Sequence, residues 1–150
     1  MKIINTLEAI LMFFKNAVPH PTAKNFSTQL GVHFEEVREM VQELNPLNPV
    51  AADILRDLDA QLHLAAEYLK QNAGTVVLKN RVEYLDALCD QIVTATGCAH
   101  MAGMGILDAA DHVAASNLSK FDDNLQPIFD ANQKIMKGPN YFKPDLAPFV

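Results

Sequence analysis

Apolar residues at helical spacing, interrupted by short proline and glycine segments, constrain the fold of this chain more than any other feature. They recur every three or four residues along five segments, as on one face of an α-helix. The expected helices cover about residues 5–16, 25–44, 51–71, 79–102 and 108–117, the second starting no later than residue 28. Between them stand helix-ending sequences such as Asn45-Pro46-Leu47-Asn48-Pro49 and Gly103-Met104-Gly105. The chain is therefore predicted to be all-α, a bundle of four or five helices.

The composition supports one compact domain over residues 1–150. Of the 150 residues, 49% are hydrophobic and 20% are charged, which suits a single core better than two domains or a disordered tail. From Ser116 onward the sequence becomes polar and contains proline and glycine, so we expect an irregular C-terminal arm there. Strand-like alternation is limited to a weak pattern at residues 75–78.

The net charge and the hydropathy of the chain indicate which binding partners and which cellular compartment to expect. A net charge of −6 lacks the positive balance of a nucleic-acid binder, and no apolar run reaches the roughly 18–20 residues that span a bilayer. We expect neither nucleic acid nor membrane as a partner, and no secretory signal. Cys89 and Cys98 are about 13 Å apart along one expected helix, too far for a disulfide. A cytoplasmic location is expected, with both cysteines in the core.

Two expected helices carry acidic residues whose spacing puts the carboxylates on one face. Glu36 and Glu39 are three residues apart on one face of the second helix, and Glu36 borders its apolar side. The fourth carries Glu83, Asp86 and Asp90 at intervals of three and four residues. Carboxylates at the edge of a core repel one another unless a cation or an arginine joins them. Oxygen donors from two facing helices are what Mg²⁺ and Mn²⁺ prefer, so the pattern predicts a metal site.

Other interpretations of these acids stay open at this point. Either set alone is typical of a solvated helix face. A di-iron carboxylate bundle has the same architecture but needs Glu-x-x-His on two helices. No glutamate in this chain has a histidine three residues later, which favours Mg²⁺ or Mn²⁺ over a di-iron centre.

Four segments between Glu35 and Leu146 occur in an order that carries a family resemblance. They are Glu35-Glu36-x-x-Glu39, Glu83-x-x-Asp86 with Asp90, Ser116-Asn117-Leu118-Ser119-Lys120, and the segment from Lys137-Gly138-Pro139 to Leu146. The set resembles the all-α nucleoside triphosphate pyrophosphohydrolases, the superfamily of MazG, the dimeric dUTPases and phosphoribosyl-ATP pyrophosphohydrolase. The last two segments resemble its phosphoribosyl-ATP-pyrophosphohydrolase-like branch.

The resemblance implies roles for individual residues and a reaction. The implied metal ligands, with Asp90 as a secondary one, are Glu36, Glu39, Glu83, Asp86 and Asp90. Glu35 and Glu36 are the implied catalytic residues, Glu35 orienting or deprotonating the attacking water, and Asn117 and Lys120 match residues that contact phosphates. The implied reaction is Mg²⁺-dependent hydrolysis of a (deoxy)nucleoside triphosphate between its α- and β-phosphates, with Mn²⁺ as a substitute cofactor. Homodimers or homotetramers are implied as well.

The final segment and the substrate leave alternatives open. Lys134, Lys137 and Lys143 suit an arm that contacts phosphates, as well as an ordinary solvated tail. Tyr141 either stacks on a base or anchors the arm, and we predict that Lys137 and Tyr141 contact substrate. The alternative functions are hydrolysis of phosphoribosyl-ATP or a modified nucleotide, and a non-catalytic helical bundle that oligomerises or binds a partner.

Overall fold

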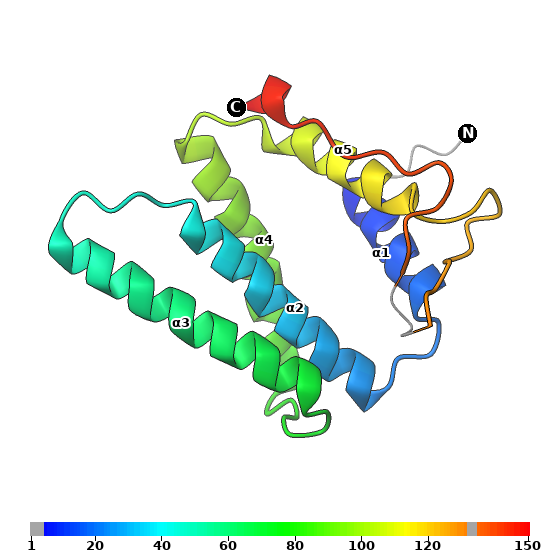
Figure 1. The fold of residues 1–150 in the computed structure, drawn as a ribbon, viewed down its shortest axis with the longest axis horizontal. Coiled ribbons are helices and arrows are strands. Elements are labelled where there is room, and N and C mark those ends of the chain that lie inside the picture. The colour runs from blue at the N-terminus through cyan, green and yellow to red at the C-terminus, as the bar shows by residue number, and fades with distance from the viewer. Residues whose placement is uncertain (1–4, 132–134) are drawn as a thin grey trace. The chain divides into compact units, whose positions relative to one another are not determined.

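The computed structural model describes residues 5–131 and 135–150. In these ranges lie the α-helices α1 (Thr6–Ala17), α2 (Ala23–Gln42), α3 (Pro49–Gln71), α4 (Arg81–Met101) and α5 (Ile106–Leu118) and the 3₁₀ turn η1 (Ala147–Phe149) (Figure 1). No strand forms in the described ranges, and residues 75–78 belong to a loop. No described helix is long and apolar enough to cross a membrane. The all-α class predicted from the sequence is confirmed.

Capping residues set the helix starts and account for the differences from the predicted bounds. α2 begins at Ala23 because Thr22 and Asn25 form a capping box, in which each side chain accepts a hydrogen bond from the other residue's backbone amide. α3 begins at Pro49, two residues earlier than expected. Asn48 caps this helix, and a proline in the first turn needs no amide partner. Pro49 therefore opens α3, although the sequence prediction counted it among the residues that end the preceding helix.

The chain divides into two compact units. One unit, residues 20–79, contains α2 and α3. The other combines the chain up to Pro19 with the chain from Asn80 onward, and contains α1, α4 and α5. Each unit has packing contacts of its own. The prediction of one domain over residues 1–150 stays a prediction.

In the α2–α3 unit, small residues let two antiparallel helices approach each other closely (Figure 1). Gly31 is buried on α2, and a Cβ atom at this position would lie 2.7 Å from the backbone oxygen of Ala66 on α3. One turn earlier, the buried hydroxyl of Ser27 donates a hydrogen bond of 2.7 Å to the backbone oxygen of Leu69. A side chain as short as serine reaches a neighbouring backbone only when the helices nearly touch. These two positions therefore fix the distance between α2 and α3.

In the second unit, α1 packs against α5, and the segment after α5 folds back onto the end of that helix. Phe121, the largest fully buried side chain among the described residues, stacks on Phe13 of α1 with ring centroids 4.9 Å apart. The backbone amide of Gly138 donates a 3.0 Å hydrogen bond to the backbone oxygen of Lys120. A Cβ at Gly138 would lie 2.7 Å from that same oxygen, so only glycine fits this contact.

α4 differs from the other helices because it buries none of its residues. Val82, Leu85 and Val93 on this helix are 74%, 63% and 66% exposed. Cys89 and Cys98 are exposed too, so the prediction that they are core residues is wrong. The periodicity of α4 correctly predicted a helix with an apolar face, but it did not tell whether its own unit covers that face.

Candidate functional site

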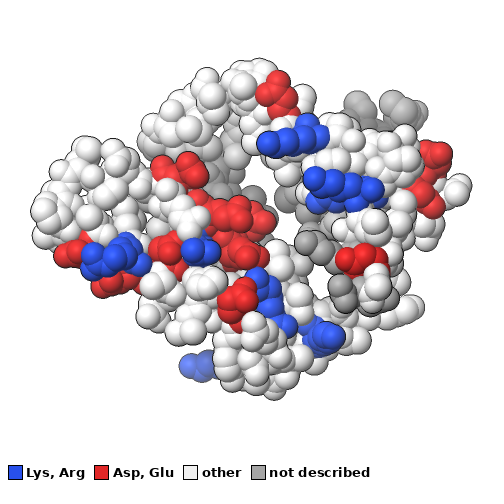
Figure 2. Space-filling model, in the orientation of Figure 1, with Lys and Arg blue, Asp and Glu red and all other residues white. Residues whose placement is uncertain are grey.

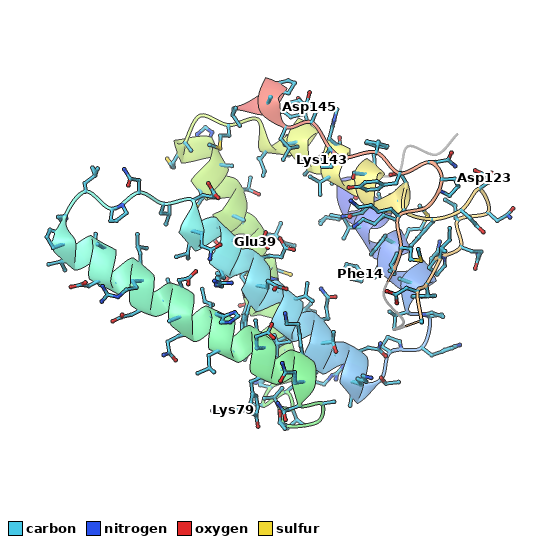
Figure 3. The ribbon with its side chains drawn as sticks, in the orientation of Figure 1. Phe14, Glu39, Lys79, Asp123, Lys143 and Asp145 are labelled. Carbon is cyan, nitrogen blue, oxygen red and sulfur yellow. The ribbon has the colours of Figure 1, made fainter. Side chains whose placement is uncertain are left out.

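The first acidic set lies in the middle and second half of α2. Glu36 and Glu39 are both exposed, and because they are three residues apart they project from one side of the helix. Glu35 is only partly exposed, since it lies closer to α3. Figure 2 shows acidic side chains along the C-terminal half of α2, and Figure 3 shows Glu39 projecting from this helix. The donors at this surface are carboxylate oxygens, which suit a hard divalent cation.

Glu35 is paired across the helix interface with Lys70 of α3. The Lys70 ammonium donates hydrogen bonds to both carboxylate oxygens of Glu35, at 3.2 and 3.3 Å. It also lies 2.6 Å from a carboxylate oxygen of Glu67, one turn earlier on α3. Hydrogen bonding to Glu67 and Glu35 raises the pKa of Lys70, outweighing the burial that lowers it. Lys70 is thus a cation held between two carboxylates.

A second ionic contact joins α2 to α3 farther along the unit. Arg38 donates to both carboxylate oxygens of Asp59, at 3.0 and 3.4 Å, and Gln42 donates to one of them at 2.8 Å. Burial raises the pKa of Asp59, but the hydrogen bonds from Gln42 and Arg38 more than offset this and leave the pKa below its usual value. This contact involves none of the predicted site residues.

The second acidic set lies on α4, in the other unit. Glu83, Asp86 and Asp90 are all exposed, at the predicted intervals of three and four residues along the helix. Asn80 caps α4 by accepting hydrogen bonds from the amides of Val82 and Glu83, which places Glu83 in the first turn. The three carboxylates share one side of α4 and border its exposed apolar residues.

The structure places each acidic set on one helix, and the two helices belong to different units. Within neither unit do the described residues bring three or more His, Cys, Asp or Glu side chains together as a metal site. Each set alone offers oxygen donors of the right chemistry for Mg²⁺ but too few converging ones to hold it. The joining of the two sets around a cation stays a prediction.

The predicted phosphate-contacting residues lie at the end of α5. The Lys120 ammonium donates a 2.8 Å hydrogen bond to the side-chain oxygen of Asn117, and both residues are half-buried. The hydroxyls of Ser116 and Ser119 bind the returning segment at Phe142, the first donating to its backbone oxygen and the second accepting from its amide. The two serines therefore hold the returning segment, while Asn117 and Lys120 contact each other.

Lys137 and Tyr141 contact each other in the returning segment. The Lys137 ammonium lies over the Tyr141 ring, 4.5 Å from its centroid, which is a cation–π contact. Tyr141 is half-buried and Lys137 is exposed. Lys143 projects from the segment that follows (Figure 3), and Lys134 lies outside the described residues. The contact supports an anchoring role for Tyr141 and leaves base stacking untested.

Sequence reasoning missed Lys70, the lysine whose ammonium contacts Glu35 in the first acidic set. One signal was present, since Glu67 and Lys70 are three residues apart on an expected helix and so share a face. The contact with Glu35 joins residues 35 positions apart, and only the register between α2 and α3 reveals it.

Comparison with known proteins does not identify a relative. No family model, no curated protein and no solved structure matches this chain. The function proposed below therefore rests on the resemblance of the four sequence segments and on where the structure places their residues.

Proposed function

We propose that this protein is a Mg²⁺-dependent nucleotide pyrophosphohydrolase of the cytoplasm. It would hydrolyse a (deoxy)nucleoside triphosphate between the α- and β-phosphates to a nucleoside monophosphate and pyrophosphate. The observation that carries the proposal is the arrangement on α2. Glu36 and Glu39 present two exposed carboxylates on one side of the helix, while Glu35 is held beside them by Lys70. Glu35 would therefore serve in proton transfer, while Glu36 and Glu39 would bind the cation.

Each residue has a role that its chemistry allows. Glu36, Glu39, Glu83 and Asp86 would hold the cation, with Asp90 as a further ligand. Two or more divalent cations held there would supply positive charge between these carboxylates and the roughly four negative charges of a triphosphate, which would otherwise repel each other. Glu35 accepts a proton from the attacking water, whose oxygen bonds to phosphorus as the α–β anhydride bond breaks and pyrophosphate leaves.

Positively charged and polar groups of the second unit would bind the phosphates. Lys120, with its ammonium already directed by Asn117, would act as a point charge on a phosphate oxygen. Lys137 and Tyr141 would contact the rest of the nucleotide. Phosphoribosyl-ATP or a modified nucleotide would use the same groups, because none of them distinguishes one base from another.

The test is release of pyrophosphate from a panel of ribo- and deoxynucleoside triphosphates at micromolar protein. We expect release with Mg²⁺ and with Mn²⁺, and none with EDTA. The rank order of the release rates among the substrates identifies the preferred base. Absence of turnover on every nucleotide, including phosphoribosyl-ATP, would contradict the proposal.

The exposed apolar face of α4 favours self-association, the basis of the second candidate function. Val82, Leu85, Ile92 and Val93 lie on one side of the helix, and each is at least half exposed. An exposed apolar surface bordered by charge is typical of a protein–protein interface. We propose that a second copy of the chain covers this face, in a homodimer or homotetramer. If the chain has no turnover, this assembly remains as a non-catalytic bundle.

Replacing Leu85 and Ile92 together by aspartate should convert the assembly to monomers, because charge would enter an apolar interface. Light scattering coupled to size-exclusion chromatography measures the mass, and circular dichroism checks that the helices persist. Val77→Asp is the matched control, since Val77 is 88% exposed in the loop before α4. A wild-type chain that is already monomeric at micromolar concentration would overturn the proposed assembly.

A further inference from the structure

Lys70 is held from three sides, unlike an ordinary surface lysine. Its side-chain Cγ would lie 2.8 Å from a Cβ atom on Gly31, so its stem occupies the space that this glycine leaves on α2. Its ammonium contacts Glu67 on its own helix and Glu35 on the neighbouring one. The side chain is 24% exposed, which limits screening by water. Because the stem and the ammonium of Lys70 are both held in place, Lys70 fixes the position of the Glu35 carboxylate that it contacts.

The partner it fixes is the one acid of the α2 set that is turned toward α3. Gly31, which touches α3, precedes Glu35 by four residues, so the two lie on nearly the same side of α2. Counting about 100° per residue from Gly31, Glu39 lies about 80° and Glu36 about 140° round the helix, and both side chains are exposed. Three glutamates within about one turn repel one another. Without a counter-ion on the α3 side, the Glu35 carboxylate would be free to swing toward a cation that Glu36 and Glu39 help to bind.

We propose that Lys70 is a positioning residue that holds Glu35 against α3 and so keeps it out of the metal ligand set. The inference rests on the proposed function, because it assigns Glu35 to proton transfer and Glu36 and Glu39 to the cation. Lys70 itself touches neither substrate nor cation. It acts by preventing the Glu35 carboxylate from turning toward the cation.

The test is a double-mutant cycle on Mn²⁺ affinity, with the free ion counted by electron paramagnetic resonance in the absence of nucleotide. Lys70→Met frees Glu35 and should tighten Mn²⁺ binding by about three- to tenfold. In the Glu35→Gln background the same change should alter affinity less than about twofold. Asp59→Asn, which breaks the other ionic contact between α2 and α3, is the matched control and should leave affinity unchanged.

Two results of the cycle would overturn the inference. If Lys70→Met tightens binding equally with and without Glu35, Lys70 acts through its charge alone. If Lys70→Met and Asp59→Asn change affinity alike, the lysine only joins the helices.

Turnover separates this inference from the proposed function. We expect Lys70→Met to lower kcat about tenfold or more at saturating metal with KM nearly unchanged, and Lys70→Arg to restore most of it. Wild-type kcat in Lys70→Met would overturn the inference and leave the function standing. Coupling in the metal cycle without turnover on any nucleotide would support Lys70 as the residue that holds Glu35 and contradict the function. A wild-type protein that binds no Mn²⁺ would overturn both.

Discussion

Replacing Gly31 by alanine should destabilise the α2–α3 unit by about 1–3 kcal/mol, in spite of alanine's higher helix propensity. The added methyl group would lie 2.7 Å from the backbone oxygen of Ala66 and 2.8 Å from Cγ of Lys70. The lysine stem can move, but the backbone of α3 can yield only if the whole helix shifts. Such a shift would lengthen the hydrogen bond between Ser27 and Leu69. Gly31→Val should therefore cost more than Gly31→Ala.

Chemical denaturation measures the effect, and α4 offers a matched control. Gly97 is also a helical glycine, but a Cβ there would meet nothing within 4 Å. Gly97→Ala should stabilise the protein by about 0.5–1 kcal/mol, the ordinary helix-propensity gain. Equal and stabilising effects at both glycines would show that the close approach of α2 and α3 does not exist in solution.

The fold class and most helix bounds could be predicted because they depend on local information. The 3.6-residue period of apolar side chains gave the number and order of the helices, and Asn72-Ala73-Gly74 correctly marked the end of α3. The start of α3 was missed because proline both stops a helix and opens one, and only the cap at Asn48 distinguishes the two cases. Burial was harder to predict, as the exposed cysteines of α4 show, because it depends on which element covers a face.

The candidate site could be predicted only within single helices. Spacing of three and four residues placed Glu36 with Glu39 and Glu83 with Asp86, because helix geometry alone decides this. The link between Glu35 and Lys70 depends on packing between helices, which no local pattern encodes. The same holds for the glycine at position 138, whose close contact with the backbone of Lys120 depends on the path of the returning segment.

The largest effect on activity is expected from removing the charge of one proposed metal ligand on either helix. Glu39→Gln and Asp86→Asn should each lower kcat/KM by at least about 100-fold, since changes that only affect groups supporting a metal ligand already cost about 10- to 100-fold. Both replacements keep the size of the side chain, and both positions are exposed, so the helices should remain intact. Metal affinity should fall along with turnover.

A glutamate on the same side of α2 distinguishes loss of a ligand from loss of surface charge. Glu43 caps the C-terminal end of α2, four residues after Glu39, and is exposed as well. Glu43→Gln removes the same charge from the same face and should leave kcat/KM within about twofold of the wild type. If Glu39→Gln behaves like Glu43→Gln, the α2 acids form a solvated face. If Glu39→Gln loses activity and Asp86→Asn does not, α2 carries the ligands and α4 is assigned wrongly. Loss in both variants, with Glu43→Gln unaffected, would support the assignment of metal ligands to both acidic helices.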